Sequence, residues 1–522
     1  MAAVRNILFI MCDRLRADYL SCYGHLRLAT PNIDRLAALG TKFTHCYVQA
    51  TVCAPSRMSF YTGRYVSSHG ATGNAVPLPV GERTLGDYLR AAGLRTALVG
   101  KSHATPDVEG IKRLGLDPEQ GIGLFLTEAG FEPYARHDGI VTEQKLAQRA
   151  QAYNAFLQAK GYAGRIPWHD FANSGLDPEG RIASGWYMPN AKLPARVPEA
   201  DSETAWTTDL GIDFIREQGE RPWCLHLSYI KSHWPYVAPA PYHALFGPED
   251  SGAPARVERE REDAHPVYRA FRHERASQAF ARDEVRQTVL PAYMGLVKQI
   301  DDHIGRLLAV LQEDGRMDDT LIVFSSDHGD FFGDHWLGDK ELFFETSVRV
   351  PLIVYDPALE ASRGATSDAL VEAIDLLPTF LEALGELIPG HVLEGRSLLP
   401  TIRGGRAPAR DAVFSELDYS FYEARREVNV GPSEARAVMV RTSDWKLVHY
   451  DGFPPQLYDL ANDPLELEDR GAKPDAASMR KALYDLLFDW MRRRRHRITI
   501  ADAEVPRLAD RAQTQGVIIG EW

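Results

Sequence analysis

The sequence predicts an α/β fold: a large sheet covered by helices on both faces, followed by a smaller C-terminal part with an antiparallel sheet. Through residues 6–356, short apolar runs alternate with stretches of helical periodicity, which is typical of strands buried in a mostly parallel sheet. After residues 401–411 the pattern changes to DAVFSEL, AVMVRTSDWKLVHY and QLYDL, which is typical of an antiparallel meander. These two observations define the fold class.

Composition limits the kinds of protein that this chain can be. It has 522 residues, 44% of them hydrophobic and 25% charged, which excludes a disordered, collagen-like or coiled-coil protein. At roughly 150 residues per domain, the length predicts two to four domains, or one large domain with an appendage. The net charge of −13 leaves no broad basic face for nucleic acid, so an anionic ligand must meet a local positive site.

The N-terminus and the cysteines bear on location. The apolar run before Asp13 is too short for a signal peptide or a spanning helix, so we expect no membrane segment and a first buried strand. The five cysteines are odd in number and form no C-x-x-C pair, which argues against a disulfide framework and a zinc ribbon. A reducing, cytoplasmic setting is therefore expected.

The predicted buried strands are residues 6–12, 96–100, 223–230, 320–326 and 351–356. Between the third and fourth of them, apolar residues recur in steps of three and four from Tyr293 to Leu311. This spacing predicts a helix that packs on the sheet and ends near Gly315. Asp301 and Asp302 of this helix are expected to be solvated.

Two long segments, residues 105–200 and 236–286, are rich in Pro, Gly and charge and have weak periodicity. Loops of this length usually line a site or build an interface. Within the second segment, residues 256–265 are expected to form a solvated helix face or a lid. Trp168, Trp186, Trp206 and Trp234 could offer an aromatic wall for a ligand, but packing of several of them is the simpler expectation.

A domain boundary is expected near residue 405, in the Gly/Arg/Pro-rich stretch 401–411. Residues 1–405 would form the α/β domain. Residues 406–522 would form a subdomain with the antiparallel sheet and a helix at about 476–492. The tail after residue 495 is expected to be an arm exchanged between subunits.

The densest chemical signal is Cys53-Ala-Pro-Ser-Arg57. Pro55 suits the first position of a helix, which would place Cys53 just before a helix N-terminus. Free N–H groups and the helix dipole there favour anions and lower the pKa of a thiol. Arg57, one turn into the helix, could reach back toward Cys53. The simpler alternative is a buried structural cysteine.

Polar residues follow two of the predicted strands directly. Asp13 follows the first strand, and Asp327 and His328 follow the fourth. Open α/β sheets place their ligands at the carboxyl edge, so these side chains are expected to lie together. Two carboxylates and one imidazole make a plausible site for a divalent cation. In isolation, Asp-His-Gly could equally be a turn.

Further basic residues also follow strands. Lys101 and His103 follow the strand at 96–100, and His233 follows the strand at 223–230. Histidine can act as an acid or a base at neutral pH. Together these residues predict an anion pocket, to which Lys340 could add charge. A cation, a nucleophile and a pocket for a tetrahedral anion point to hydrolysis of a sulfate or phosphate ester.

The residues around Cys53 resemble the sulfatase signature C-x-P-S/A-R, in which the cysteine is oxidised after translation to formylglycine. Matching segments follow in order along almost the whole chain: RNILFIMCD, TPNIDRLAALGTKF, HLSYIKSHWPY, DDTLIVFSSDHGD, RVPLIV, WKLVHY and QLYDLANDPLE. The chain therefore resembles the type I sulfatases and phosphonate monoester hydrolases, which depend on formylglycine and belong to the alkaline phosphatase superfamily.

The resemblance implies an alkaline-phosphatase-like fold, with a large mixed, mostly parallel sheet flanked by helices. The chain looks closest to the bacterial phosphonate monoester hydrolase and arylsulfatase branch, whose members are cytoplasmic and often oligomeric. A homo-oligomer, either a dimer or a tetramer, is expected. The resemblance also implies one divalent cation, Mn²⁺ or Ca²⁺, and an enzyme that converts Cys53 to formylglycine.

Carried over by position, the resemblance makes Cys53, as the formylglycine hydrate, both the nucleophile and a metal ligand. The other metal ligands would be Asp13, Asp327 and His328. An aldehyde hydrate solves the problem of turnover: one hydroxyl attacks, and the other expels the sulfate by C–O cleavage. Covalent catalysis is thus split into two easier steps.

Five further roles are implied by the resemblance. Arg57 would hold the hydrate and Lys101 would bind the anion. His103 would be the base that collapses the covalent ester after the leaving group departs. His233 and Lys340 would bind the ester and help the leaving oxygen.

One residue departs from the family pattern. Sulfatases usually have a second Asp after the first metal-binding Asp, and phosphonate hydrolases have Gln, whereas this chain has Arg14. Arginine cannot ligate a metal. Either the metal has fewer protein ligands, or Arg14 points away and pairs with a carboxylate, or it binds the substrate. We expect a weakened but occupied metal site, with Asn74 as another polar residue lining the pocket.

Three functions remain open from the sequence. Lys101 and His103 resemble the sulfatase K-x-H pattern and favour hydrolysis of sulfate monoesters. The overall layout favours a phosphonate monoester or phosphodiester hydrolase, and one enzyme could accept both kinds of ester. The third possibility is a non-catalytic relative that binds anions. The expected partners are a small-molecule ester and the maturation enzyme, with no nucleic acid and no membrane.

Overall fold

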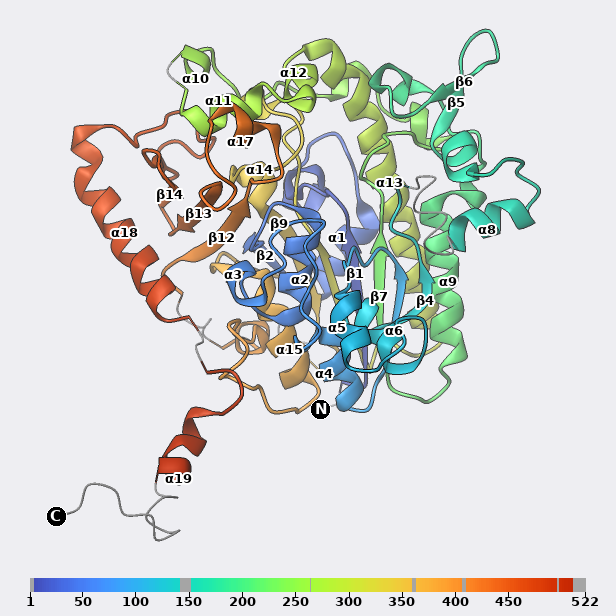
Figure 1. The fold of residues 1–522 in the computed structure, drawn as a ribbon. Helices are drawn as coiled ribbons and strands as arrows, with labels where there is room; N and C mark the ends of the chain where they lie inside the picture. Colours follow the sequence, from blue (N-terminus) through green and yellow to red (C-terminus); the bar gives the residue numbers. More distant parts are fainter. Residues whose placement is uncertain are drawn as a thin grey trace, which may run out of the picture.

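The computed structural model describes residues 4–140, 152–262, 264–358, 363–405, 410–494 and 497–509, and Figure 1 shows a central sheet between helices. The strand order is β10-β2-β9-β8-β1-β7-β3-β4, and β11 also pairs with β2. The strands are β1 (Asn6–Cys12), β2 (Thr41–Tyr47), β3 (Arg95–Gly100), β4 (Glu132–Arg136), β7 (Trp223–Tyr229), β8 (Thr320–Ser326), β9 (Arg349–Tyr355), β10 (Ala365–Ser367) and β11 (Val371–Glu372). Only β9 among them runs antiparallel to its neighbours, so the predicted mixed, mostly parallel sheet is confirmed.

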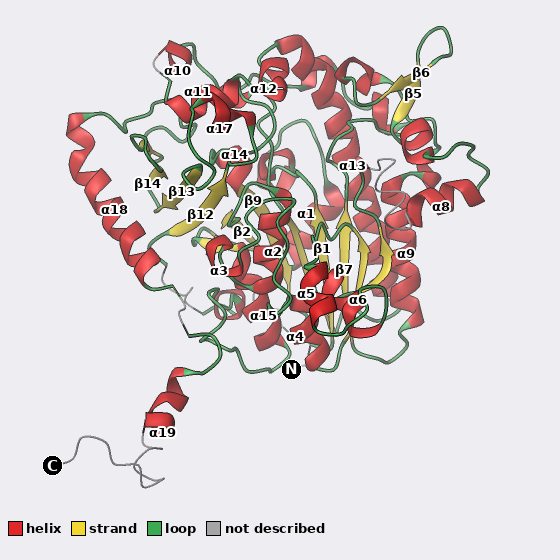
Figure 2. Ribbon diagram, viewed as in Figure 1, coloured by secondary structure: helices red, strands yellow, loops and turns green. Residues whose placement is uncertain are grey.

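Both faces of the sheet are buried, as a strand of continuous apolar residues requires. Successive residues of β1 alternate between the two faces: Phe9 packs in one core and Leu8 in the other. The first core includes residues of α2 (Cys53–Thr62), α4 (Leu85–Ala91) and α15 (Leu376–Ala383). The second includes residues of α1 (Pro31–Leu39), α9 (Glu203–Glu217) and α13 (Asp283–Glu313). Figure 2 shows these helices around the yellow strands.

The helix α13 packs on the sheet as predicted, but the prediction that Asp301 is solvated is wrong. Its carboxylate is fully buried and accepts the backbone N–H groups of Asn32 and Ile33, each at 2.9 Å. Those groups lie in the first turn of α1, where N–H groups have no partner within the helix. A neighbouring helix thus caps α1, while Asp302 remains partly exposed.

The C-terminal region forms an antiparallel sheet in the order β12-β13-β14-β15. Its strands are β12 (Val413–Asp418), β13 (Arg436–Arg441), β14 (Trp445–Tyr450) and β15 (Gln456–Asp459). Leu483 and Leu487 of α18 (Ala477–Arg492) pack in a small core with Val440 and Leu447. The opposite face joins the large core through Met439 and other residues. The division at residue 405 stays a prediction, and residues 406–409 lie outside the described residues.

The two long segments expected to be loops contain several short elements. The remaining elements of the described chain are α3 (Val66–His69), α5 (Val108–Arg113), α6 (Gly121–Thr127), α8 (Ala152–Ala159), β5 (Ser174–Leu176), β6 (Ile182–Ser184), α10 (Arg259–Glu262), α11 (Pro266–Arg272), α12 (Arg275–Phe280), α14 (Glu345–Val348), α16 (Leu399–Ile402), α17 (Glu423–Glu427) and α19 (Val505–Ala509), besides short turns of 3₁₀ or π-helix. Among the described helices, none has the length and apolar character needed to cross a membrane. The end of the predicted arm, residues 510–522, lies outside the described residues.

Candidate active site

Cys53 lies at the start of a helix, as the sequence predicts, but the helix begins earlier than Pro55 indicates. It starts at Cys53 itself, and the Cys53 side chain is buried. The N–H of Ala54 in this first turn donates to Oδ1 of Asn74 at 2.9 Å. The exposed Asn74 therefore acts as a cap for one free N–H group of α2.

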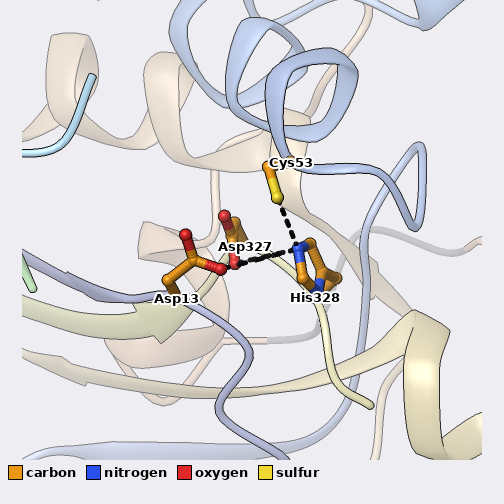
Figure 3. Close-up of side chains that lie close together, drawn as sticks. All are labelled: Asp13, Cys53, Asp327 and His328. Atoms are coloured by element: carbon orange, nitrogen blue, oxygen red, sulfur yellow. Dashed lines mark hydrogen bonds and ion pairs between the residues drawn. The ribbon is translucent and has the colours of Figure 1, made fainter. Parts of the chain in front are cut away.

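Asp13, Cys53, Asp327 and His328 form one compact cluster (Figure 3). Their potential ligand atoms all lie within 4.8 Å of one another, and all four residues are buried. Asp13 follows β1, and Asp327 and His328 follow β8, its parallel neighbour. The carboxyl ends of these strands therefore bring the three ligands to the same edge of the sheet.

The donor atoms of this cluster fit a divalent cation. The Nδ1–H of His328 donates to the carbonyl of Gly329 at 2.8 Å, which directs Nε2 toward the other three residues of the cluster. This Nε2 lies 3.7 Å from Oδ1 of Asp13 and 3.6 Å from Oδ1 of Asp327. Oδ1 of Asp13 is buried and has no hydrogen-bond partner among the described residues. Two carboxylates around an imidazole, one with an unsatisfied oxygen, suit a hard cation.

Positive side chains surround the Cys53 sulfur. Nζ of Lys340 donates to Sγ at 3.2 Å, and Nε2 of His328 lies 3.1 Å from it. Burial alone would raise the pKa of the Cys53 thiol, but Lys340, Lys101 and His328 outweigh it and hold the pKa well below its ordinary value. A negative group at position 53 is thus stabilised.

Arg57 contacts the cluster differently from the way the sequence suggests. Its Nε donates to Oδ2 of Asp327 at 2.8 Å, and its Nη1 donates to the carbonyl of Lys101 and to Oγ of Ser228, each at 2.8 Å. Its Nη2 is buried without a hydrogen-bond partner within the described part of the chain. Arg57 therefore fixes a candidate metal ligand and the backbone at Lys101, while its Nη2 lies 3.8 Å from Oδ2 of Asp13, beyond hydrogen-bond distance.

Lys101 forms an ion pair with Oδ2 of Asp13. Burial would raise the pKa of the Asp13 carboxyl, but the Lys101 ammonium outweighs burial and lowers it. Asp13 is therefore a carboxylate at neutral pH. Because Lys101 follows β3 and Asp13 follows β1, this pair spans the sheet edge across β7.

The two predicted histidines lie next to Cys53. Burial, and then the Lys101 charge, lower the pKa of His103, while a hydrogen bond to Cys53 opposes them. Burial also lowers the pKa of His233 to about 3, again against a hydrogen bond to Cys53. The Nδ1–H of His233 donates to the carbonyl of Trp234 at 2.9 Å. Both imidazoles are therefore neutral at neutral pH, the form that a base requires.

Arg14 pairs with carboxylates, the second of the three options that the sequence left open. Its Nη1 lies 2.7 Å from Oδ2 of Asp330, and its Nη2 forms an ion pair with Asp339. The guanidinium also lies over the Trp234 ring, 5.4 Å from the centroid. Arg14 and Asp330 are both buried. Trp234 thus borders the site, whereas Trp168 and Trp206 are buried in the second core.

Sequence reasoning missed several residues that complete the site. Asp330 could have been found, because a buried Arg14 needs a carboxylate and Asp330 lies three residues after Asp327. Tyr422 carries no such signal. It belongs to the C-terminal region, yet its pKa is raised by burial and then by the nearby Glu341 and Cys53, so this region contributes to the site.

Comparison with known proteins agrees with this geometry. The family model "Sulfatase" matches residues 5–386, and the model "N-sulphoglucosamine sulphohydrolase, C-terminal" matches residues 333–493. The multifunctional alkaline phosphatase superfamily protein PehA of Trinickia caryophylli is 31% identical, over 93% of this chain and 95% of PehA. An arylsulfatase of Clostridium perfringens is 28% identical, over 88% of this chain and 89% of its own length.

A solved structure extends the similarity to three dimensions. The phosphonate monoester hydrolase SpPMH from Silicibacter pomeroyi superposes with a TM-score of 0.82 and 28% identity, over 95% of this chain and 96% of that protein. The family match spans most of the chain and includes every residue of the Asp13, Cys53, Asp327 and His328 cluster. The chain is therefore a hydrolase that belongs to the sulfatase family of the alkaline phosphatase superfamily.

Proposed function

We propose that this protein hydrolyses sulfate monoesters, as arylsulfatases do. The observation that carries the proposal is the convergence on residue 53 of two ammonium groups, from Lys101 and Lys340, and two neutral imidazoles, from His103 and His233. Preorganised positive groups in a buried site stabilise charge that develops on a tetrahedral anion. Neutral imidazoles can accept the protons that ester hydrolysis releases.

Sulfatases generally depend on a formylglycine and a divalent cation. In this chain Cys53 would be converted to formylglycine by a maturation enzyme. Asp13, Asp327 and His328 would hold the cation, which we propose to be Mn²⁺ or Ca²⁺. A bound cation would supply positive charge against the anionic oxygens of the ester.

The remaining side chains have distinct proposed roles. Lys101 would bind the anionic oxygens, while His233 and Lys340 would bind the ester, with the Lys340 ammonium facing the leaving oxygen. His103 would take a proton from residue 53 in the step that releases the sulfate. Nη2 of Arg57, which makes no hydrogen bond among the described residues and lies 3.8 Å from Oδ2 of Asp13, would hold an oxygen of residue 53, while the rest of the guanidinium fixes Asp327.

The second candidate function is hydrolysis of phosphonate monoesters or phosphodiesters. The similarity to SpPMH, a phosphonate monoester hydrolase, favours it. Lys101 and His103, which match the sulfatase K-x-H pattern, favour sulfate. We therefore rank sulfate first and the phosphonate second.

Kinetics with two aryl esters tests this ranking. We expect kcat/KM for 4-nitrophenyl sulfate to exceed that for a phenylphosphonate monoester. A large preference for the phosphonate would reject the first candidate in favour of the second. Cys53→Ala should abolish turnover of both esters, whereas Cys224→Ala, which alters another buried cysteine, should retain it.

A non-catalytic role is tested by mass spectrometry of the peptide that contains Cys53. Protein made in a host with the maturing enzyme should show the mass loss that accompanies conversion of a thiol to an aldehyde. An unmodified thiol throughout, together with no turnover of either ester, would favour the anion-binding alternative over any hydrolase.

We also propose a cytoplasmic homo-oligomer, a dimer or tetramer, with a C-terminal domain over residues 406–522. The five free cysteines support a reducing compartment. In Figure 1, α19 stands away from the rest of the chain, which supports an arm that packs on another subunit. Truncation at residue 495 should lower the mass found by sedimentation, and an unchanged mass would contradict the arm.

A further inference from the structure

The segment that follows β4 lies beside the catalytic turn at residues 101–103. Strand β4 pairs in parallel with β3, and Arg136, the last residue of β4, is aligned with Gly100. Parallel neighbours end at the same edge of a sheet, so the residues after each strand meet there. The N–H of His137 donates to the carbonyl of Gly100 at 2.8 Å, which joins the two segments.

Asp138 binds the backbone of that turn directly. Its Oδ1 accepts the N–H groups of Ser102 and His103, each at 3.0 Å. His103 has φ = 50°, a left-handed conformation that residues other than glycine rarely adopt. Such a conformation is strained and persists only where the surroundings impose it. Two hydrogen bonds to one carboxylate oxygen provide that constraint.

Asp138 is held in turn by the partly buried Arg136 and, through it, by the buried Glu128. Nε of Arg136 donates to Oδ2 of Asp138 at 2.8 Å, and Nη1 of Arg136 forms an ion pair with Glu128. The second oxygen of Glu128 accepts the hydroxyl of Ser102 at 2.8 Å. The turn is therefore bound through the backbone by Asp138 and through the Ser102 side chain by Glu128, with Arg136 linking the two carboxylates.

The imidazole of His103 has little else to orient it. Its Nδ1 is buried and has no hydrogen-bond partner among the described residues. Apart from the Cys53 sulfur, no hydrogen-bond partner of the ring is found in the described chain, so the direction of the imidazole follows from the backbone at His103. The backbone is what Asp138 fixes.

We propose that Asp138 is a positioning residue: by holding the left-handed turn at His103, it aims the imidazole at residue 53. Arg136 and Glu128 keep Asp138 in place. This inference rests on the proposed function, because it requires His103 to act on residue 53. It adds a residue that touches neither the substrate nor the reacting atoms.

A graded set of variants tests the proposal. Asp138→Ala removes the acceptor, and we expect kcat to fall by about 10- to 100-fold with KM changed less than about threefold, because misplacement of a catalytic group mainly affects the chemical step. Asp138→Asn keeps an amide oxygen where Oδ1 lies but places an NH₂ group against Nε of Arg136, so it should recover only part of the lost kcat. Equal losses in both variants would contradict a positioning role for that oxygen.

A double-mutant cycle separates positioning from a general loss of structure. In a His103→Ala background, Asp138→Ala should cause almost no further loss of kcat, because the group it positions is absent. The same loss in both backgrounds would overturn the proposal. Asp301→Asn is the matched control: Asp301 also accepts two backbone N–H groups, but at the start of α1, and this variant should leave kcat unchanged.

Two further measurements keep the outcomes distinct. Thermal melting shows whether each variant is folded, and mass spectrometry gives the fraction of residue 53 that is modified, so that kcat refers to active protein. A wild-type enzyme without turnover of either ester would defeat the proposed function. An active wild type whose kcat is unaffected by Asp138→Ala would defeat only the inference about Asp138.

Discussion

The guanidinium of Arg14 has acidic partners at both terminal nitrogens, whereas its Nε is buried without a hydrogen-bond partner among the described residues. It is buried together with Asp330 and is also bound by Asp339 and the Tyr236 hydroxyl, the latter at 3.3 Å. Burial would lower the pKa of Arg14, but Asp330 and the other partners raise it above its ordinary value. Arg14 therefore remains charged, and its charge offsets the negative charges of Asp330 and Asp339 beside the candidate metal-binding cluster.

Removing this charge should destabilise the protein strongly. Arg14→Met leaves Asp330 buried without its partner, and loss of one member of a buried pair costs about 3–5 kcal/mol. Urea unfolding measures the difference in the free energy of unfolding. Arg27→Met is the control, because Arg27 and Asp250 form an exposed pair at 3.0 Å, and such pairs contribute less than about 1 kcal/mol. Similar losses in the two variants would contradict the role given to Arg14.

At the scale of single residues, the sequence predicts the site residues that directly follow a strand. It misses residues whose role depends on contacts with a distant segment of the chain. Asp13, Asp327 and His328 could be placed together because each follows a strand of one sheet. Asp138 could not, because its importance depends on the register of β4 against β3 and on the backbone at His103. Neither the register of paired strands nor the backbone conformation of a single residue can be predicted from amino-acid composition and motif spacing.

At the scale of elements, the cap of α1 shows how tertiary contacts replace local ones. The Thr30 side chain makes no capping hydrogen bond to α1. Asp301 supplies the acceptor from α13, and its second oxygen accepts Nδ2 of Asn32 at 3.1 Å. Two helices on one face of the sheet are therefore joined by a buried carboxylate as well as by apolar packing.

The cap predicts a difference between adjacent acidic residues. Asp301→Ala leaves the N–H groups of Asn32 and Ile33 without acceptors and should lower the free energy of unfolding by about 1–3 kcal/mol. Asp302→Ala removes a partly exposed side chain and should cost less than about 1 kcal/mol. Chemical denaturation of the two variants checks this. A larger loss for Asp302→Ala would be incompatible with the cap.

Elements with continuous apolar sequence were predictable to within a residue or two. The runs at 6–12 and 320–326 match β1 and β8 at both ends. The boundary of α2 was not predictable from Pro55, because a proline is also tolerated within the first turn, and the helix begins at Cys53. The burial of Asp301 was missed for a related reason. Helical periodicity predicts the face of the helix on which a residue lies, but not the polar groups of other elements that pack against that residue.

At the scale of the whole molecule, stability should depend on pH through buried carboxyl groups of two kinds. Burial would raise the pKa of Glu203, but Lys231 and His137 outweigh it and lower the pKa, so Glu203 contributes stability at neutral pH that is lost in acid. Burial raises the pKa of Glu128 to about 7, against the Arg136 charge. Glu128 therefore contributes stability in acid that is lost toward neutral pH, the opposite of Glu203.

The direction in which Glu128 makes stability change with pH follows from the number of protons that the folded and unfolded states bind. Between its ordinary pKa of 4.5 and about 7, the folded protein binds more protons at Glu128 than the unfolded chain does. Its contribution to stability is thus fully present below the ordinary pKa and is lost as pH rises through about 7. Glu128→Gln removes this term, so the variant should lose stability less steeply than the wild type between pH 5 and pH 7, by on the order of 1–3 kcal/mol.

Urea unfolding of both proteins at several pH values tests this prediction. The difference between variant and wild type isolates Glu128, because the other carboxyl groups are common to both proteins. Parallel stability curves over this range would show that Glu128 is ionised in the folded state at every pH tested. The electrostatic link between Glu128, Arg136 and Asp138 would then be a permanent ion pair rather than one that weakens as Glu128 takes up a proton.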